Sequence, residues 1–462
     1  MHLDEYAGYD AVGLRALIAT GEVSAAEVED TARRALDAAN EVVNGLAVPL
    51  FAPALDHAED GPFAGVPFLI KDSGPMASGV PFFCGSRAVP GVLAGQDHEL
   101  MARFRAAGLV TLGLTTAPEL GLSFATEPVR SGPTRNPWDP QRGVGGSSGG
   151  AAALVAAGAV PVAHGNDGAG SIRIPASCCG LVGLKPTRGR TPSGPDPFGM
   201  VHEFALTRTV RDAAHLLDAV AGPGVGDRYP APPPAGSYAA ELGRDPGRLR
   251  VAVTASAGTA VDPEVASAAL RVGTVLEELG HTVEAAGPDV DRESAVHAQK
   301  GELVGIAAPF LMAPRRPDPA RMEAVSRRVL VHAAELTALD LVGTFAAQDR
   351  VSRAVAGFFA GYDLLVTPTL ARLPAPHGTL RQDDPGHTVD SWLRSLLEYG
   401  PFTSAFNVSG HPAVSLPLAQ SVGGLPIGVQ LVAGYGREDL LFRVAVQLEE
   451  ALPWRDRRPV RR

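Results

Sequence analysis

The sequence has few cysteines and lacks the short motifs that bind metals. Three cysteines, Cys84, Cys178 and Cys179, occur in 462 residues, too few for a framework of disulfides. Neither Cys-x-x-Cys nor His-Glu-x-x-His occurs, so the sequence predicts no structural or catalytic metal site. Proteins without disulfides are typical of reducing compartments, so we expect this protein to be cytoplasmic.

Positive charge and long hydrophobic runs are also scarce. Residues 1–30 contain neither a basic stretch nor a continuous apolar run, so we expect no signal peptide and no membrane span. The chain has 40 basic and 50 acidic residues and a formal net charge of −10. An acidic surface disfavours nucleic acid and anionic lipid, and neither is expected as a partner.

Lysine is the rarest charged residue. Only Lys71, Lys185 and Lys300 occur among the 40 basic residues, so arginine supplies nearly all of the positive charge. A lysine, unlike an arginine, loses its proton when burial lowers its pKa. The segment PFLIKD places Lys71 at the inner end of an apolar run, which favours a neutral lysine that acts as a base. A surface lysine paired with Asp72 is the ordinary alternative.

The composition and the order of elements predict a large α/β protein. A hydrophobic content of 45% with 19% charged residues is typical of globular proteins. The residues 24–40 read as a helix opened by a capping box of Ser24 and Glu27, and apolar runs over 61–72, 362–370, 411–418 and 424–434 read as strands. We expect an exposed, proline- and glycine-rich linker at 222–237 and a helical segment on the substrate side at 290–360. Because the apolar segments on either side of the linker would each leave a sheet half covered, we predict a single domain over 1–462.

Two glycine- and serine-rich clusters flank an apolar segment that reads as a buried helix. They are GGSSGG at 145–150 and GAGS at 168–171, and glycine lets backbone N–H groups approach a developing anion. Ser171 is the candidate nucleophile. His164 and Asp167 lie nearby and suggest a Ser/His/Asp triad, but triads are set in space and not by closeness in sequence.

A second pattern, Gly146-x-Ser148-x-Gly150, satisfies the nucleophile-elbow motif of α/β-hydrolases. That motif requires a strand leading into the serine, and the residues before Ser148 read instead as a proline-bearing turn. The elbow is therefore the weaker interpretation, and Lys71 remains the favoured base.

Lys71 in PFLIKD, Ser147 in GGSSGG and Ser171 in GSIRIPASCCGLVGLKPT together resemble the amidase signature family. They lie 76 and 24 residues apart, and the resemblance runs from the first helix to the last. It implies a single domain with a mixed central β-sheet covered by helices on both faces, and a signature core over 65–215. It also implies that Ser171 attacks the amide carbonyl while Ser147, after a cis peptide bond, relays the proton to a neutral Lys71.

The resemblance further assigns an oxyanion hole to the backbone N–H groups of Gly168, Ala169, Gly170 and Ser171. Ser148, Asp167 and Arg173 would support the site. The family commonly has Thr-Gly-Gly-Ser where this chain has Gly168-Ala169-Gly170-Ser171. Ala169 would be strained if its position required a positive φ.

The implied activity is hydrolysis of a small linear or cyclic amide through an acyl-enzyme, with no cofactor. Residues 165–190, 406–418 and 424–441 resemble most the aminohexanoate cyclic-dimer hydrolase branch of the family. Two alternatives stay open: a glutamine-dependent amidotransferase subunit of the A type, and acyl transfer to an amine in a biosynthetic pathway. The sequence also leaves a homodimer open, and it does not identify the natural substrate or the residues that line its pocket.

Overall fold

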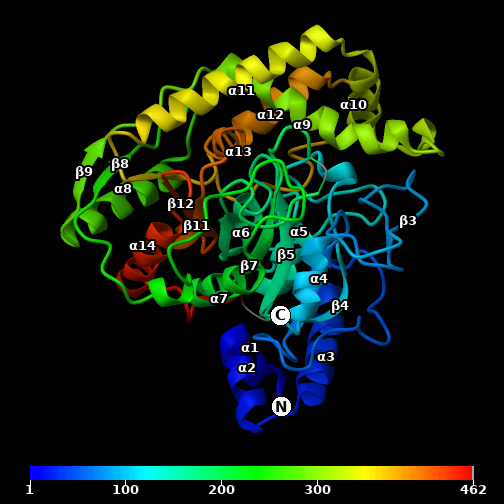
Figure 1. Ribbon diagram of the computed structural model, residues 1–462, viewed down its shortest axis with the longest axis vertical. Coiled ribbons are helices and arrows are strands. Elements are labelled where there is room, and N and C mark those ends of the chain that lie inside the picture. Colours follow the sequence, from blue (N-terminus) through cyan, green and yellow to red (C-terminus); the bar gives the residue numbers. More distant parts are fainter. Residues whose placement is uncertain (195, 460–462) are drawn as a thin grey trace.

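A large mixed β-sheet runs through the protein (Figure 1). The computed structural model describes residues 1–194 and 196–459. Within them, ten strands follow one another in the order β4-β1-β5-β7-β6-β11-β12-β10-β8-β9, and β2 and β3 form a separate pair. The strands are β1 Pro67–Lys71, β2 Pro81–Phe82, β3 Val92–Leu93, β4 Val110–Thr115, β5 Val162–Asp167, β6 Val182–Lys185, β7 His202–Thr207, β8 Arg250–Val253, β9 Thr282–Ala285, β10 Leu364–Pro368, β11 Ala413–Gln420 and β12 Pro426–Ala433.

Helices flank this sheet and form two layers. One layer is formed by a row of helices in which each packs on the next, in the order α4, α7, α14 and α8. The other layer is a similar row of α3, α5 and α6. The predicted single domain with a mixed, helix-covered sheet is confirmed. The helices are α1 Leu3–Gly8, α2 Ala11–Thr20, α3 Ala25–Val43, α4 Glu99–Ala106, α5 Gly149–Ala156, α6 Arg173–Cys179, α7 Val210–Val220, α8 Pro263–Glu278, α9 Arg292–Met312, α10 Ala324–Glu335, α11 Ala338–Phe358, α12 Val389–Tyr399, α13 Ser404–Ser409 and α14 Glu438–Ala451.

Local sequence explains where the first long helices begin and end. Ser24 and Glu27 form the predicted capping box at the start of α3, which satisfies N–H groups that have no partner within the helix. Gly21 ends α2 with a φ of 74°, a left-handed conformation that glycine adopts without strain. The eight residues of α5 are all buried, as expected for a helix that is apolar all round.

The strands β1 and β5 bring two distant segments to the same edge of the sheet. β1 runs parallel to both β4 and β5, so its C-terminal end lies beside the C-terminal end of β5. Lys71 is the last residue of β1, and Asp167 is the last residue of β5. In α/β sheets, this carboxyl edge is where ligands usually bind.

The strand β5 continues to Asp167 and pairs with β7 along its whole length, so the loop that carries Ser171 begins only after Asp167. The helix α6 follows this loop and leads into β6. Gly180 separates them with a φ of 73°.

The helices α9 to α13 gather on one side of the sheet, uppermost in Figure 1. Most of the residues 290–360, predicted as helical, lie in α9, α10 and α11, whereas 222–237 contain no helix or strand and are mostly exposed. No single helix of the described chain has the length and hydropathy needed to cross a membrane. The helices α10 and α11 have that length and hydropathy only when they are taken together, and the chain bends by 108° between them.

Candidate active site

Lys71 and Ser147 are in direct contact at the carboxyl edge of the sheet. The Nζ atom of Lys71 lies 2.6 Å from Ser147 Oγ and donates a second hydrogen bond of 2.6 Å to Asn166 Oδ1. The side chain of Lys71 is fully buried, and Ser147 is 2% exposed. The structure therefore joins two residues that are 76 positions apart in the sequence.

Burial lowers the pKa of Lys71 from 10.5 to about 7. Removal from water disfavours the charged ammonium, and the nearby carboxylates of Glu203 and Asp167 oppose this effect only in part. A large share of Lys71 is consequently neutral near pH 7. A neutral amine can accept a proton, which an arginine in this position cannot do.

Ser147 and Ser171 belong to two loops that are bonded to each other. The peptide bond between Gly146 and Ser147 is cis. The backbone N–H of Ser148 donates to the carbonyl oxygen of Ser171 over 3.2 Å, and Ser148 Oγ donates to the carbonyl oxygen of Asn166. Ser148 thus links the GGSSGG loop both to the candidate nucleophile's loop and to β5.

The loop 168–171 has backbone N–H groups that make no hydrogen bond to any described residue, whereas the next two, of Ile172 and Arg173, donate to Asp167 Oδ2. A row of unpaired N–H groups beside a serine is what an oxyanion requires. The backbone turns sharply at Gly170, where φ is +140°. Ala169 is not among the residues with positive φ, so the expected strain at this departure from the family pattern does not arise.

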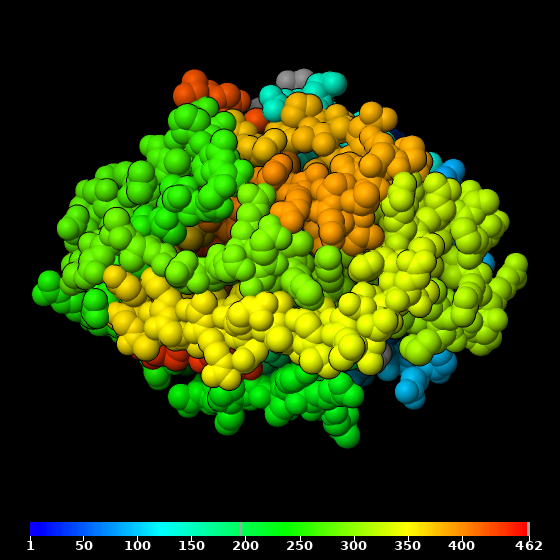
Figure 2. Space-filling model, turned by 90° about the horizontal axis from the view of Figure 1, so that it is seen from above, coloured from blue at the N-terminus to red at the C-terminus, as the bar shows by residue number. Residues whose placement is uncertain are grey.

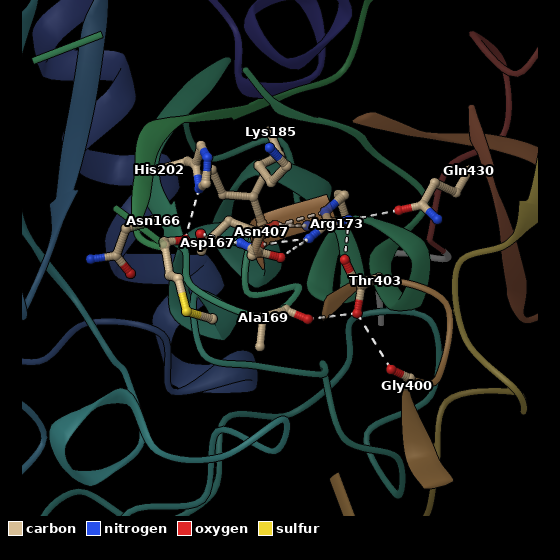
Figure 3. A network of polar contacts seen from close by, with 12 residues as sticks. Asn166, Asp167, Ala169, Arg173, Lys185, His202, Gly400, Thr403, Asn407 and Gln430 are labelled. Atoms are coloured by element: carbon tan, nitrogen blue, oxygen red, sulfur yellow. Dashed lines mark hydrogen bonds and ion pairs between the residues drawn. The ribbon is translucent and has the colours of Figure 1, made fainter. Parts of the chain in front are cut away.

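Asp167 and Arg173 form a buried ion pair behind this loop (Figure 3). Both are fully buried, and Arg173 contacts Asp167 through Nε at 2.9 Å and Nη2 at 2.8 Å. Burial alone would raise the pKa of Asp167, but the charge and hydrogen bonds of Arg173 hold it well below its usual range. Losing one partner of such a pair typically costs about 3–5 kcal/mol, so the pair stabilises the loop that carries Ser171.

Three residues from the C-terminal third of the chain complete this network. Asn407 and Gln430 accept hydrogen bonds from Arg173 over 2.6 and 2.7 Å. Thr403 donates through Oγ1 to the carbonyl oxygen of Ala169 over 2.6 Å. Sequence reasoning missed all three, because they lie more than 200 residues from the loop they hold and no motif marks them.

His164 is engaged away from the Ser171 loop. It is fully buried, its Nε2 lies 2.6 Å from Glu203 Oε2, and its Nδ1 accepts the backbone N–H of Lys71 over 3.4 Å. Burial lowers the pKa of His164, and an Nδ1 atom that accepts a hydrogen bond carries no proton. With both ring nitrogens occupied, His164 is not available as the base for Ser171.

Asn166 is a further site residue that sequence reasoning missed. It accepts the hydrogen bond from Lys71, and its Nδ2 donates to Glu203 Oε1 over 3.4 Å. Asn166 lies two residues after His164, so both side chains are on the same side of β5. This could have been predicted only if the strand had been expected to extend to Asp167.

The other two lysines are placed differently. Lys185 is buried, and its Nζ donates to the carbonyl oxygen of Pro186 over 2.9 Å. Lys300 lies on α9 and forms an ion pair of 2.8 Å with Asp390. Of the three lysines, only Lys71 contacts a serine hydroxyl.

A small cavity of about 30 Å³ opens onto Ser171. That volume holds about one or two water molecules. On the face drawn in Figure 2, the green and yellow helices α9 to α11 and the orange segment around α12 form the outer surface of this region. The cavity is lined by Gly121, Leu122, Ser123, Phe124, Ala169, Ser171, Gln299, Glu302, Leu303, Ile306, Leu393, Leu396 and Leu397.

The residues that commonly bind metals are dispersed. In residues 1–194 and 196–459, no three His, Cys, Asp or Glu side chains come together in a way that could hold a metal ion. The three cysteines are buried and free. Burial raises the pKa of Cys84 and of Cys178 to about 12.

Comparison with known proteins agrees with this geometry. The amidase family model matches residues 27–442. The chain is 40% identical to the 6-aminohexanoate-cyclic-dimer hydrolase of Paenarthrobacter ureafaciens, over 97% of this chain and 96% of that protein. The solved structure of a 6-aminohexanoate cyclic dimer hydrolase matches 98% of this chain and 99% of its own with a TM-score of 0.92 and 40% identity.

A bacterial aryl acylamidase described as an amidase signature enzyme has the same fold. It matches 96% of both chains with a TM-score of 0.82 and 25% identity. The family model and the relatives thus cover nearly the whole sequence. We conclude that the chain belongs to the amidase family, the amidase signature enzymes, and is a hydrolase of carbon–nitrogen bonds other than peptide bonds.

Proposed function

We propose that this protein hydrolyses small, largely apolar amides, cyclic ones included, through Ser171, Ser147 and Lys71 and an acyl-enzyme intermediate. The observation that carries the proposal is the 2.6 Å contact between buried Lys71 and Ser147, beside a loop of unpaired N–H groups that ends at Ser171. The apolar side chains of the cavity favour a substrate with hydrocarbon next to the amide. The 40% identity to a hydrolase named for a cyclic dimer supports a cyclic amide.

Acylation begins with two proton transfers. Ser171 Oγ attacks the carbonyl carbon as its proton passes to Ser147 Oγ and the Ser147 proton passes to neutral Lys71. The carbonyl oxygen becomes an oxyanion, which the N–H groups of residues 168–171 stabilise. A single donor in such a hole is typically worth roughly 2.7–4 kcal/mol.

Collapse of this intermediate reverses the relay. The proton held by Lys71 returns through Ser147 to the amide nitrogen, and the carbon–nitrogen bond breaks. The amine of a linear amide leaves, whereas that of a cyclic amide stays attached to the acyl chain. Ser171 then carries the acyl group as an ester. Water attacks that ester and passes a proton through Ser147 to Lys71. The relay then returns this proton to Ser171 Oγ as the carboxylic acid is released, which restores Ser171. Asn166 holds the amine of Lys71 in line with Ser147 throughout.

Product analysis on the purified chain tests this function. We expect the protein alone to convert linear amides with aliphatic substituents into the amine and the acid, to open cyclic ones to the chain that carries both groups, and to leave glutamine largely unchanged. Added amines compete with water for the acyl-enzyme and report acyl transfer directly. Glutaminase activity that requires a stoichiometric partner would favour the amidotransferase instead, and a predominance of new amides would favour acyl transfer.

The proposed base predicts a pH dependence. Lys71 must be neutral to accept a proton, and its pKa is lowered to about 7 by burial. We therefore expect kcat/KM to fall about tenfold per pH unit below this pKa and to level off above it. Initial rates between pH 5 and 9 measure this fall in kcat/KM, and an uncharged amide is used so that the substrate itself does not titrate. A profile that stays flat down to pH 5 would contradict the assignment of Lys71 as base.

A further inference from the structure

One face of α9 presents polar and apolar side chains to the cavity at Ser171. Gln299, Glu302, Leu303 and Ile306 all line it. Their spacing of three, four and seven residues places them on one side of the helix. Apart from Ser123, the lining from residues 121–124 and from α12 is apolar. Gln299 and Glu302 are therefore the polar groups that α9 adds to a largely hydrocarbon surface.

The side-chain amide nitrogen of Gln299 is buried and has no hydrogen-bond partner among the described residues. Gln299 is 3% exposed, and its Nε2 makes no hydrogen bond to any described residue. A buried donor left unpaired typically costs about 1–3 kcal/mol, and such groups in native proteins call for an explanation. A hydrogen-bond acceptor supplied by a bound substrate would remove that cost.

Glu302 lies against the beginning of the loop that carries Ser171. Its Oε1 would be only 1.7 Å from a Cβ atom placed on Gly168, so the carboxyl group packs directly on the backbone of that glycine. Asp167, Asp196 and Lys71 are the charged groups near it. Burial raises the pKa of Glu302 to about 8, which makes it mostly uncharged near pH 7 and suits a neutral ligand better than a cation.

A donor and an acceptor on the same helix face complement a secondary amide. Such an amide offers a carbonyl oxygen that accepts from Gln299 Nε2 and an N–H that donates to a carboxyl oxygen of Glu302. The leucine, isoleucine and phenylalanine side chains that line the same cavity suit a methylene chain. We propose that Gln299 and Glu302 bind a second, unreacted amide of the substrate and so select neutral aliphatic diamides over monoamides.

This inference rests on the proposed function, and its test compares two matched substrates. One is a macrocyclic diamide of two 6-aminohexanoate units, and the other is a monolactam of similar ring size. Gln299→Leu removes the donor but keeps much of the volume. We expect it to lower kcat/KM for the diamide by about tenfold to a hundredfold, mainly through KM, and to change the monolactam value less than about threefold.

Glu302 is tested by two variants that separate an acceptor from a charge. Glu302→Gln keeps a carbonyl acceptor and should retain most of the diamide preference, whereas Glu302→Leu should lose it. Leu396→Met, at an apolar position of the same cavity, is the matched control and should affect both substrates alike. Thermal melting of each variant verifies folding, and Gln299→Met provides a second donor-free variant.

The outcomes distinguish the two levels of the proposal. Wild-type protein that is inert towards all amides would contradict the proposed function. An active enzyme whose Gln299 variants lose both substrates equally would contradict the diamide subsite alone. A Glu302→Gln variant that specifically loses substrates bearing an ammonium group would show that Glu302 is a counter-ion, and would also overturn the subsite.

Discussion

Ser171→Ala should lower amide turnover by at least about 10³-fold while the protein remains folded. Removal of Ser171 Oγ leaves no atom to form the acyl-enzyme, whereas the unpaired N–H groups of the loop 168–171 are kept. Loss of a serine nucleophile in a comparable enzyme costs up to about 10⁶-fold in kcat. The measurement is the steady-state rate with a chromogenic anilide, together with mass spectrometry for the acylated serine.

Ser177→Ala is a suitable control for this experiment. Ser177 is a buried serine of α6 whose Oγ accepts the N–H of Gly428 over 3.0 Å, away from Lys71. Its loss should reduce stability by about 1 kcal/mol and change turnover little. Turnover by Ser171→Ala close to that of the wild type, in protein free of contaminating amidase, would exclude Ser171 as the nucleophile.

Lys71→Arg should be nearly as damaging, although it conserves the positive charge. The guanidinium keeps its proton at any accessible pH, so it cannot accept one from Ser147. It is also larger than the amine it replaces, and Lys71 Nζ already lies 2.6 Å from both Ser147 and Asn166. We expect a fall in kcat of about 10³-fold or more, measured on the same anilide. The decrease in kcat/KM below about pH 7 should also disappear.

Two further variants interpret that result. Lys300→Arg is the matched control, because Lys300 is a partly exposed lysine whose ion pair with Asp390 requires only charge, and it should keep normal turnover. Lys71→Met removes the base without burying a guanidinium, so its inactivity in a folded protein separates lost chemistry from misfolding. Near-normal hydrolysis by Lys71→Arg would mean that a neutral lysine is not needed.

The predicted residues of the site came from two kinds of signal. The scarcity of lysine and the apolar run before Lys71 pointed to a buried amine, and the structure places that amine on Ser147. The glycines of residues 168–171 indicated backbone N–H groups free to bind an anion, and these groups have no hydrogen-bond partner among the residues that the structure describes. Both signals are local, because a buried strand and a glycine-rich loop are encoded by neighbouring residues.

Other parts of the site depend on contacts between distant elements. His164 and Asp167 are the nearest candidates to Ser171 in sequence, yet one pairs with Glu203 and the other with Arg173. Asn166 contacts Lys71 because β1 and β5 are adjacent parallel strands. No periodicity or motif in one segment records which other segment will lie beside it.

The sequence by itself determined the α/β class, the buried strand that ends at Lys71, the apolar helix α5 and the glycine-rich loops, since each depends on hydrophobic periodicity or backbone freedom within a few residues. Only the tertiary structure decided that Asn166 and Glu203 surround Lys71 and that Thr403, Asn407 and Gln430 hold the Ser171 loop. The same is true of Gln299 and Glu302, which reach the cavity from α9. These placements follow from how the sheet and helices pack over hundreds of residues, and that packing sets both the burial that lowers the pKa of Lys71 and the polar groups available to a substrate.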